Sequence, residues 1–185
     1  MHKKKLLLGV CGAIGAINVP QYLHALNHQY EIDVILTQNA QRFITVQAIK
    51  PFVNNVFTDV LDESVIKTPH VNLAKEADVF LILPTTANFL FKLANGVADD
   101  LLSLCAVNYE DPIFLAPNMN TRMWNNHGVQ NNITKLQSYG YIFLNRTSNG
   151  VEASSGNVVN SEAALPDPHI LMNLLSRNSE KVGAY

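Results

Sequence analysis

The sequence predicts an α/β fold, a three-layer sandwich in which helices cover both faces of a parallel sheet. Short apolar runs alternate with helical stretches along the chain, as they do in successive βαβ units. Two of these runs, residues 79–83 and 113–116, are continuously apolar, which is typical of strands buried on both faces. With 185 residues, of which 48% are hydrophobic, residues 1–185 are expected to form one domain.

The first part of the chain contains two of the expected strand–helix units. Residues 6–10 are apolar, and after a glycine-rich turn a helix is expected to continue to about residue 28. Residues 32–36 form the next apolar run, which ends in the polar triplet 37–39. Residues 40–55 are then expected to be helical.

The rest of the chain follows the same alternation and ends less regularly. Residues 146–160 are rich in Ser, Asn and Gly and are expected to form a loop or a hairpin flap. Residues 178–185 are expected to be a flexible tail. Further helices are expected at 69–77, 86–95, 98–108, 121–138 and 161–176, and a further strand at 141–144.

The composition excludes several classes of function. A formal charge of −2 with only 13 Lys and Arg residues argues against a nucleic-acid-binding surface. Cys11 and Cys105 have neither a metal-binding spacing nor a disulfide framework, which suits a reducing environment. His24 and His28 fit a solvated helix face better than zinc, so no metal site is expected.

The first residues are basic and then apolar, as in a signal peptide, but Gly9, Gly12 and Gly15 interrupt the apolar stretch. No apolar run approaches the length of a membrane span. A cytoplasmic protein without membrane partners is therefore expected.

Polar clusters follow the ends of four expected strands, and these ends meet at one edge of a parallel sheet, where ligands bind. The convergence of the four clusters predicts a ligand site more strongly than any one of them does. The clusters are Gly12-Ala13-Ile14, Thr37-Gln38-Asn39, residues 84–88 with Thr86, Ala87 and Asn88, and residues 117–120 with Asn118 and Asn120.

The first of these turns does not favour a dinucleotide. Gly9, Gly12 and Gly15 lie three residues apart and do not match G-x-G-x-x-G, and no acidic residue follows the second strand. Backbone N–H groups of such a turn can hold a phosphate. Close packing of strand against helix explains the glycines equally well.

The last two clusters belong to longer motifs. Residues 84–89 read Pro-Thr-Thr-Ala-Asn-Phe, and residues 117–124 read Pro-Asn-Met-Asn-Thr-Arg-Met-Trp. They resemble the P-A-S-A-N-T and P-x-M-N-x-x-M-W motifs of the homo-oligomeric flavin-containing cysteine decarboxylases, and the resemblance extends over about residues 5–175. It implies bound FMN, a flavodoxin-like fold, and trimers that assemble into dodecamers in some relatives.

The resemblance also implies where the cofactor binds. Relatives usually have serine at the position of Ala13 and threonine at that of Phe89, and both differences are expected to weaken flavin affinity without abolishing the site. The expected cofactor-binding residues are Gly12, Ala13, Ile14, Thr37, Asn39, Thr86, Ala87, Asn88, Phe89 and Asn118.

His70 is the expected catalytic base. Thr68 is expected to cap the helix at 69–77 and Pro69 to occupy its first position, so that His70 lies in the first turn. The helix dipole there favours the neutral imidazole, which can accept a proton. Without the resemblance, a solvated histidine at a helix start would be the better explanation.

Asn120 is expected to bind the scissile carboxylate, because a neutral amide orients it without strongly stabilising the ground state. Met123, Ser154 and Ser155 are assigned to substrate binding with it. For Met123 and Trp124, packing in the core or at a subunit interface is the favoured interpretation.

Two branches of the resembled family share these motifs. One decarboxylates phosphopantothenoylcysteine in coenzyme A synthesis, with the help of a late cysteine. The other oxidises the C-terminal cysteine of a lantibiotic-type precursor peptide, so that loss of the carboxylate leaves an aminoenethiol. This chain has no cysteine after Cys105, and Ser154-Ser155-Gly156 resembles the flap of the epidermin-type enzymes.

A peptidyl-cysteine decarboxylase is therefore expected, with the precursor peptide and other peptide-modifying enzymes as partners. The alternatives are a phosphopantothenoylcysteine decarboxylase and, from a different class, a non-catalytic flavin-binding regulator.

Overall fold

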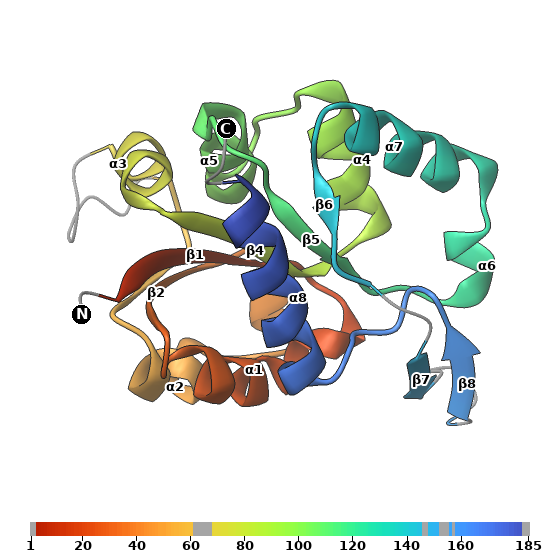
Figure 1. The fold of residues 1–185 in the computed structure, drawn as a ribbon, viewed down its shortest axis with the longest axis horizontal. Helices are drawn as coiled ribbons and strands as arrows, with labels where there is room; N and C mark the ends of the chain where they lie inside the picture. The colour runs from red at the N-terminus through yellow and green to blue at the C-terminus, as the bar shows by residue number, and fades with distance from the viewer. Residues whose placement is uncertain (1–2, 61–67, 146–147, 152–155, 157, 183–185) are drawn as a thin grey trace.

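A six-stranded parallel sheet in the order β3-β2-β1-β4-β5-β6 forms the centre of the molecule (Figure 1). The computed structural model describes residues 3–60, 68–145, 148–151, 156 and 158–182. The strands are β1 (Lys4–Val10), β2 (Tyr30–Leu36), β3 (Asn55–Phe57), β4 (Val79–Thr85), β5 (Phe114–Pro117) and β6 (Ile142–Phe143).

Helices cover both faces of the sheet, so the predicted α/β sandwich is confirmed. One apolar cluster joins α1 (Val19–Leu26), α2 (Val46–Ile49) and α8 (Pro168–Val182) to one face. A second cluster joins the other face to α3 (Pro69–Glu76), α4 (Ala87–Asn95), α5 (Leu101–Asn108) and α7 (His127–Ser138). The shorter helices are η1 (Ile14–Asn18), η2 (Ala40–Arg42), η3 (Lys50–Phe52) and α6 (Thr121–Trp124).

The expected helix at 40–55 is wrong. The segment forms η2, α2 and η3 and then enters the edge strand β3. Pro51 accounts for part of the difference, because proline is accepted in the first turn of η3 but would interrupt a longer helix. β3 has only three residues, and the side chain of Asn55 donates to Asp33 Oδ1 on β2 at 2.8 Å. So short a strand leaves no recognisable pattern in the sequence.

Two other helix boundaries also differ from the prediction. The expected helix at 121–138 is divided into α6 and α7, because the Asn126 side chain accepts the Gly128 N–H and caps a new helix. The helix expected at 161–176 begins only at Pro168, since Ser161 still belongs to a strand, and it continues to Val182.

A loop or a hairpin flap is expected within 146–160, and the described parts of this segment pair as a hairpin does, while its role as a flap stays a prediction. Strands β7 (Ser148–Val151) and β8 (Val158–Ser161) pair antiparallel and form a separate two-stranded sheet (Figure 1). In the described part of the chain, no helix combines the length and apolar character needed to cross a membrane.

The strand order defines where a ligand is expected to bind. From β1 the chain adds β2 and β3 on one side, whereas β4, β5 and β6 extend the sheet on the other. The order therefore reverses between β1 and β4. In open α/β sheets, the crevice outside the carboxyl ends of the strands at this point is the usual ligand site.

Candidate active site

Hydrogen bonds join the ends of four neighbouring strands at the carboxyl edge of the sheet. The Cys11 N–H donates to the Pro84 carbonyl at 3.1 Å, which connects the turns after β1 and β4. The Thr37 N–H donates to the Val10 carbonyl at 3.1 Å. On the other side, the Asn118 N–H donates to the Thr85 carbonyl at 2.9 Å. The four predicted clusters thus lie along one edge.

The turn after β1 presents free backbone donors. Among the described residues, neither the Gly12 N–H nor the Ile14 N–H has a hydrogen-bond partner. The turn leads into η1 rather than directly into an α-helix, and the Gly15 N–H donates to Asn118 Oδ1 at 3.0 Å. Two unpaired N–H groups beside a fixed third one form a cradle suited to an anion.

Gly12 is required by a close approach between two turns. A Cβ at this position would lie 2.5 Å from Asn39 Cβ and 2.8 Å from the Asn39 carbonyl carbon. Backbone cannot withdraw as a flexible side chain can, so a larger residue would displace the turn that contains Asn39. This contact places Gly12 and Asn39, two of the predicted cofactor-binding residues, side by side.

The turn after β4 is fixed by Thr86. Its hydroxyl accepts the Phe89 N–H at 3.2 Å and caps α4, while Ala87 and the exposed Asn88 follow in the first turn. Phe89 itself is only 2% exposed and its side chain packs in the core, so only its backbone lies near the edge. Burial raises the pKa of the Cys11 thiol, which lies beside Thr86, to about 12.

The segment after β5 uses its two asparagines differently. The Asn118 side chain accepts from Gly15 and donates to the Ala163 carbonyl at 3.3 Å, so it links two separate segments. Asn120 Oδ1 accepts the Met123 N–H at 2.8 Å and caps α6. In the described residues the Asn120 Nδ2 group has no partner, and the residue is exposed. Its amide N–H groups are therefore available to a carboxylate.

The two large side chains of this segment have different surroundings. Trp124 is 7% exposed and packs in the core, as the favoured interpretation holds. Met123 is 45% exposed, so it does not pack in the core of this chain. Packing of Met123 in the core is therefore wrong, whereas a contact with substrate or another subunit stays a prediction.

His70 is the second residue of α3. Thr68 occupies the N-cap position, but its side chain accepts no helix N–H, so the expected cap is wrong. The backbone of Thr68 is left-handed, with φ of 45°, which differs from the extended backbone usual at an N-cap. His70 Nδ1 is buried and has no hydrogen-bond partner among the described residues.

No hydrogen bond or ion pair of the described residues joins the His70 side chain to the four strand ends. Ser154 and Ser155, assigned to substrate binding, lie outside the described residues. The roles of these three residues stay predictions.

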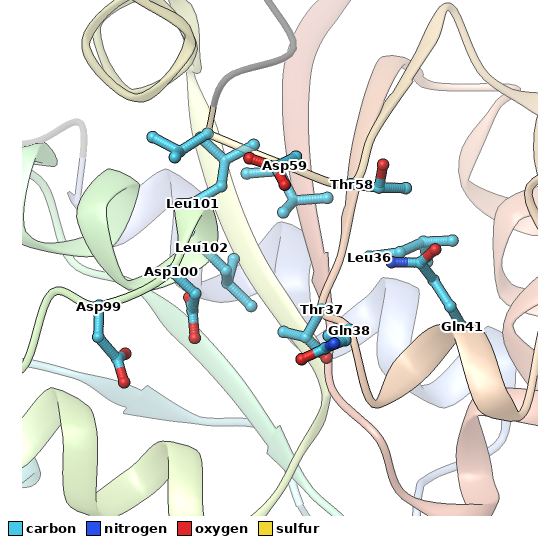
Figure 2. Close-up of a pocket in the computed structure, with 12 residues that line it drawn as sticks. Leu36, Thr37, Gln38, Gln41, Thr58, Asp59, Asp99, Asp100, Leu101 and Leu102 are labelled. Atoms are coloured by element: carbon cyan, nitrogen blue, oxygen red, sulfur yellow. The ribbon is translucent and has the colours of Figure 1, made fainter.

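A pocket of about 500 Å³ opens beside the same edge (Figure 2). Thr37 and Gln38 line one side, Asp99 and Asp100 lie opposite, and Asp59 lies at a third position. The volume is within the range of small-molecule sites. Asp59 was not predicted, because it follows β3, which the sequence pattern does not reveal.

Lys92 fixes the loop on one side of this pocket. Its ammonium group, on a side chain that is 16% exposed, pairs with Asp99 at 2.5 Å and Asp100 at 2.6 Å. Burial lowers the pKa of Lys92, but the hydrogen bonds to Asp100 and Asp99 outweigh burial and raise it. Asp100 also accepts the Ser103 N–H at 2.8 Å and caps α5. The loop is therefore held in one position.

The Flavoprotein family model matches residues 1–175, and the chain therefore belongs to the Flavoprotein family. The chain is 29% identical over 180 residues to epidermin decarboxylase of Staphylococcus epidermidis, an alignment that covers 96% of this chain and 97% of that protein. It is 40% identical over 147 residues to the probable phosphopantothenoylcysteine decarboxylase of Streptococcus mutans serotype c, covering 75% of this chain and 80% of that protein.

The fold is similar to that of EpiD complexed with the substrate peptide DSYTC, with a TM-score of 0.83 and 28% identity. This likeness covers 95% of this chain and 99% of EpiD. The resemblance found in the sequence motifs is thus confirmed, and both of its branches are represented among the relatives.

Proposed function

We propose that the protein is an FMN-dependent decarboxylase that acts oxidatively on the C-terminal cysteine of a ribosomally made precursor peptide. The observation that carries this proposal is the absence of any cysteine after Cys105. Without a late thiol, the enzyme would release an aminoenethiol and would depend on an external oxidant to restore its cofactor. The similarity to epidermin decarboxylase along nearly the full length of both chains supports the same choice.

The residues at the carboxyl edge fit a flavin mononucleotide. The unpaired N–H groups of Gly12 and Ile14 would hold its phosphate, and Asn118 would keep the turn in place through Gly15. Thr37, which lines the pocket, and Asn39 would lie beside the rest of the cofactor. When bound, FMN supplies a hydride acceptor for the cysteine Cβ, which turns the C–S bond into an electron sink for decarboxylation.

The remaining roles belong to His70 and Asn120. The partly exposed imidazole of His70 would accept the thiol proton as the C=S bond forms. The free amide of Asn120 would donate to the carboxylate and orient it for departure. Because that amide is neutral, it would not add the strong ground-state stabilisation of a fixed cation.

Mass spectrometry of short peptides ending in cysteine tests this function. A peptide incubated with the protein is expected to lose about 46 Da, which corresponds to carbon dioxide and two hydrogens. The same peptide ending in serine serves as the control, because its side chain cannot form a thiocarbonyl group. Recovery of the cysteine peptide at its original mass would contradict the proposal.

The second candidate function is decarboxylation of phosphopantothenoylcysteine. The identity of 40% to the probable enzyme of Streptococcus mutans favours it. Turnover would then remove about 44 Da, carbon dioxide alone, and the flavin would return to its oxidised form within each cycle. A protein that binds FMN but converts neither substrate would instead be a flavin-binding regulator.

Assembly into trimers or dodecamers and a cytoplasmic location are further parts of this proposal. The exposed Ile14 and Ile17, at 46% and 54%, flank the cofactor turn and would be covered by a neighbouring subunit. Light scattering of the flavin-loaded protein would determine the subunit number.

Gly12→Ala is expected to weaken FMN affinity at least about tenfold, because the new Cβ must displace the Asn39 backbone beside the phosphate turn. Equilibrium dialysis with added FMN measures the change. Gly128→Ala is the matched control, since its Cβ would meet only one side-chain atom, Asn126 Oδ1, at 3.2 Å, and that atom belongs to the cap of α7. Equal affinities for the two variants would show that the Gly12 turn does not hold the cofactor.

A further inference from the structure

Residues 162–167 connect β8 to α8 and form a strap along the carboxyl edge of the sheet (Figure 1). The strap is held at several points along its length. Near its start, Asn145 Nδ2 donates to the Glu162 carbonyl at 2.7 Å, and the Met119 N–H donates to the Ala163 carbonyl at 3.3 Å. Near its end, the buried Tyr22 hydroxyl donates to the Pro166 carbonyl at 2.5 Å. The base of the hairpin β7–β8 is thus fixed by neighbouring elements.

One of these attachments is a side-chain pair. Trp124 Nε1–H donates to Glu162 Oε2 at 3.1 Å. Trp124 is almost fully buried, so its single N–H would lose water without gaining a partner if Glu162 were absent. Glu162 is exposed, and its carboxylate would otherwise be free in solvent. The pair therefore joins the rigid core to the hairpin base through one charge-assisted hydrogen bond.

The backbone at Trp124 is itself fixed from two directions. Asn120 caps α6, the helix that ends at Trp124, and Gln130 Nε2 donates to the Trp124 carbonyl at 2.6 Å. The same short segment thus contains the proposed carboxylate-binding residue and the residue that holds the hairpin base.

The strap also reaches the cofactor turn. The Asn118 amide accepts from the Gly15 N–H and donates to the Ala163 carbonyl. A Cβ at Gly15 would lie 2.7 Å from Leu165 Cδ1, so strap and turn are in close contact. The base of the hairpin is therefore aligned with the cofactor turn as well as with Asn120.

From these contacts we infer that Trp124 and Glu162 are a positioning pair, which sets the hairpin β7–β8 relative to the bound peptide and determines peptide affinity. Neither residue touches the reacting atoms, so they act through the strap. The assignment of the hairpin to the peptide rests on the proposed function, whereas the anchoring of the hairpin by the pair does not.

The test compares Glu162→Ala, Glu162→Gln and Trp124→Phe in the flavin-loaded protein. Glu162→Ala is expected to raise KM for a cysteine-ending peptide about tenfold with kcat within about twofold, because loss of one charge-assisted bond loosens the hairpin and not the catalytic groups. Glutamine keeps a carbonyl acceptor and should restore KM to within about threefold of the native value. Trp124→Phe keeps most of the ring packing and should match Glu162→Ala.

The double variant Trp124→Phe/Glu162→Ala should be no worse than either single variant, because both remove the same bond. Glu76→Ala is the matched control. Glu76, on α3, forms an exposed ion pair with Lys5, on β1, away from the strap. An unchanged KM in Glu162→Ala, or additive losses in the double variant, would overturn the inference.

Hydrogen exchange provides a readout that does not depend on turnover. Amides of β8 (Val158–Ser161) should exchange faster in Glu162→Ala than in Glu76→Ala, while β1 and β4 stay unchanged. If no cysteine peptide is converted, the proposed function fails, but this exchange pattern would still support the anchor. Unchanged β8 exchange, or faster exchange throughout the sheet, would overturn it.

Discussion

Asn120→Asp is expected to lower kcat about 100-fold or more while the protein keeps its flavin and its thermal stability. Asn120 has two separable functions. Its Oδ1 caps α6 by accepting the Met123 N–H at 2.8 Å, whereas its Nδ2 has no partner among the described residues. Aspartate preserves the cap but replaces the donor by a negative charge facing the substrate carboxylate.

Asn120→Ala differs from Asn120→Asp because it removes both functions at once. It removes the donor amide, so activity is lost. It also removes the cap of α6, so the free energy of unfolding falls by about 1 kcal/mol. Steady-state kinetics, the visible spectrum and thermal melting distinguish the two variants. Normal turnover by either one would exclude Asn120 from binding the scissile carboxylate.

The second large effect is expected at His70. His70→Asn should lower kcat by about 100-fold to 10,000-fold, the range typical of a lost general base, and leave the purified protein yellow. His70 as a whole is partly exposed, and we propose that its imidazole accepts the proton of the substrate thiol. Asparagine has a similar size and polarity but cannot act as a base near neutral pH.

His127→Asn is the control for this substitution. His127 is exposed and is the first residue of α7, a position comparable to that of His70 in α3. If both variants retained full activity, another group would have to accept the thiol proton.

The arrangement of the strand ends was predictable from the sequence because it depends only on the order of the elements. Once apolar runs alternate with helices, parallel strands must place Gly12, Thr37, Thr86 and Asn118 along one edge. Asn39 was predicted with them, and its contact with Gly12 provides a physical reason for that glycine. Neither prediction requires knowledge of the side-chain packing.

The partners of individual side chains were not predictable in this way. Nothing in the sequence indicates that Asn118 joins Gly15 to Ala163, or that Trp124 pairs with Glu162, because these partners lie far away along the chain. Thr68 shows that even a side-chain contact with the adjacent helix cannot be predicted reliably from the sequence. A threonine before proline is a reasonable cap, but its left-handed backbone prevents the usual geometry.

Elements with little sequence pattern were also missed. β3 has three residues at the sheet edge, and without it Asp59 could not be placed beside the pocket. Phe89 belongs to a motif that predicts contact with the cofactor, and because its side chain is buried in the core, such a contact would come from its backbone. Position within a motif therefore predicts the backbone location better than the direction of the side chain.

An anaerobic titration of the purified protein with a peptide ending in cysteine tests the central claim most directly. The account predicts that the oxidised flavin band disappears as about one equivalent of peptide per FMN loses about 46 Da, and that the band returns only when oxygen is admitted. A colourless folded protein that does not take up FMN would contradict the account. So would a flavin band that persists while the peptide keeps its carboxylate.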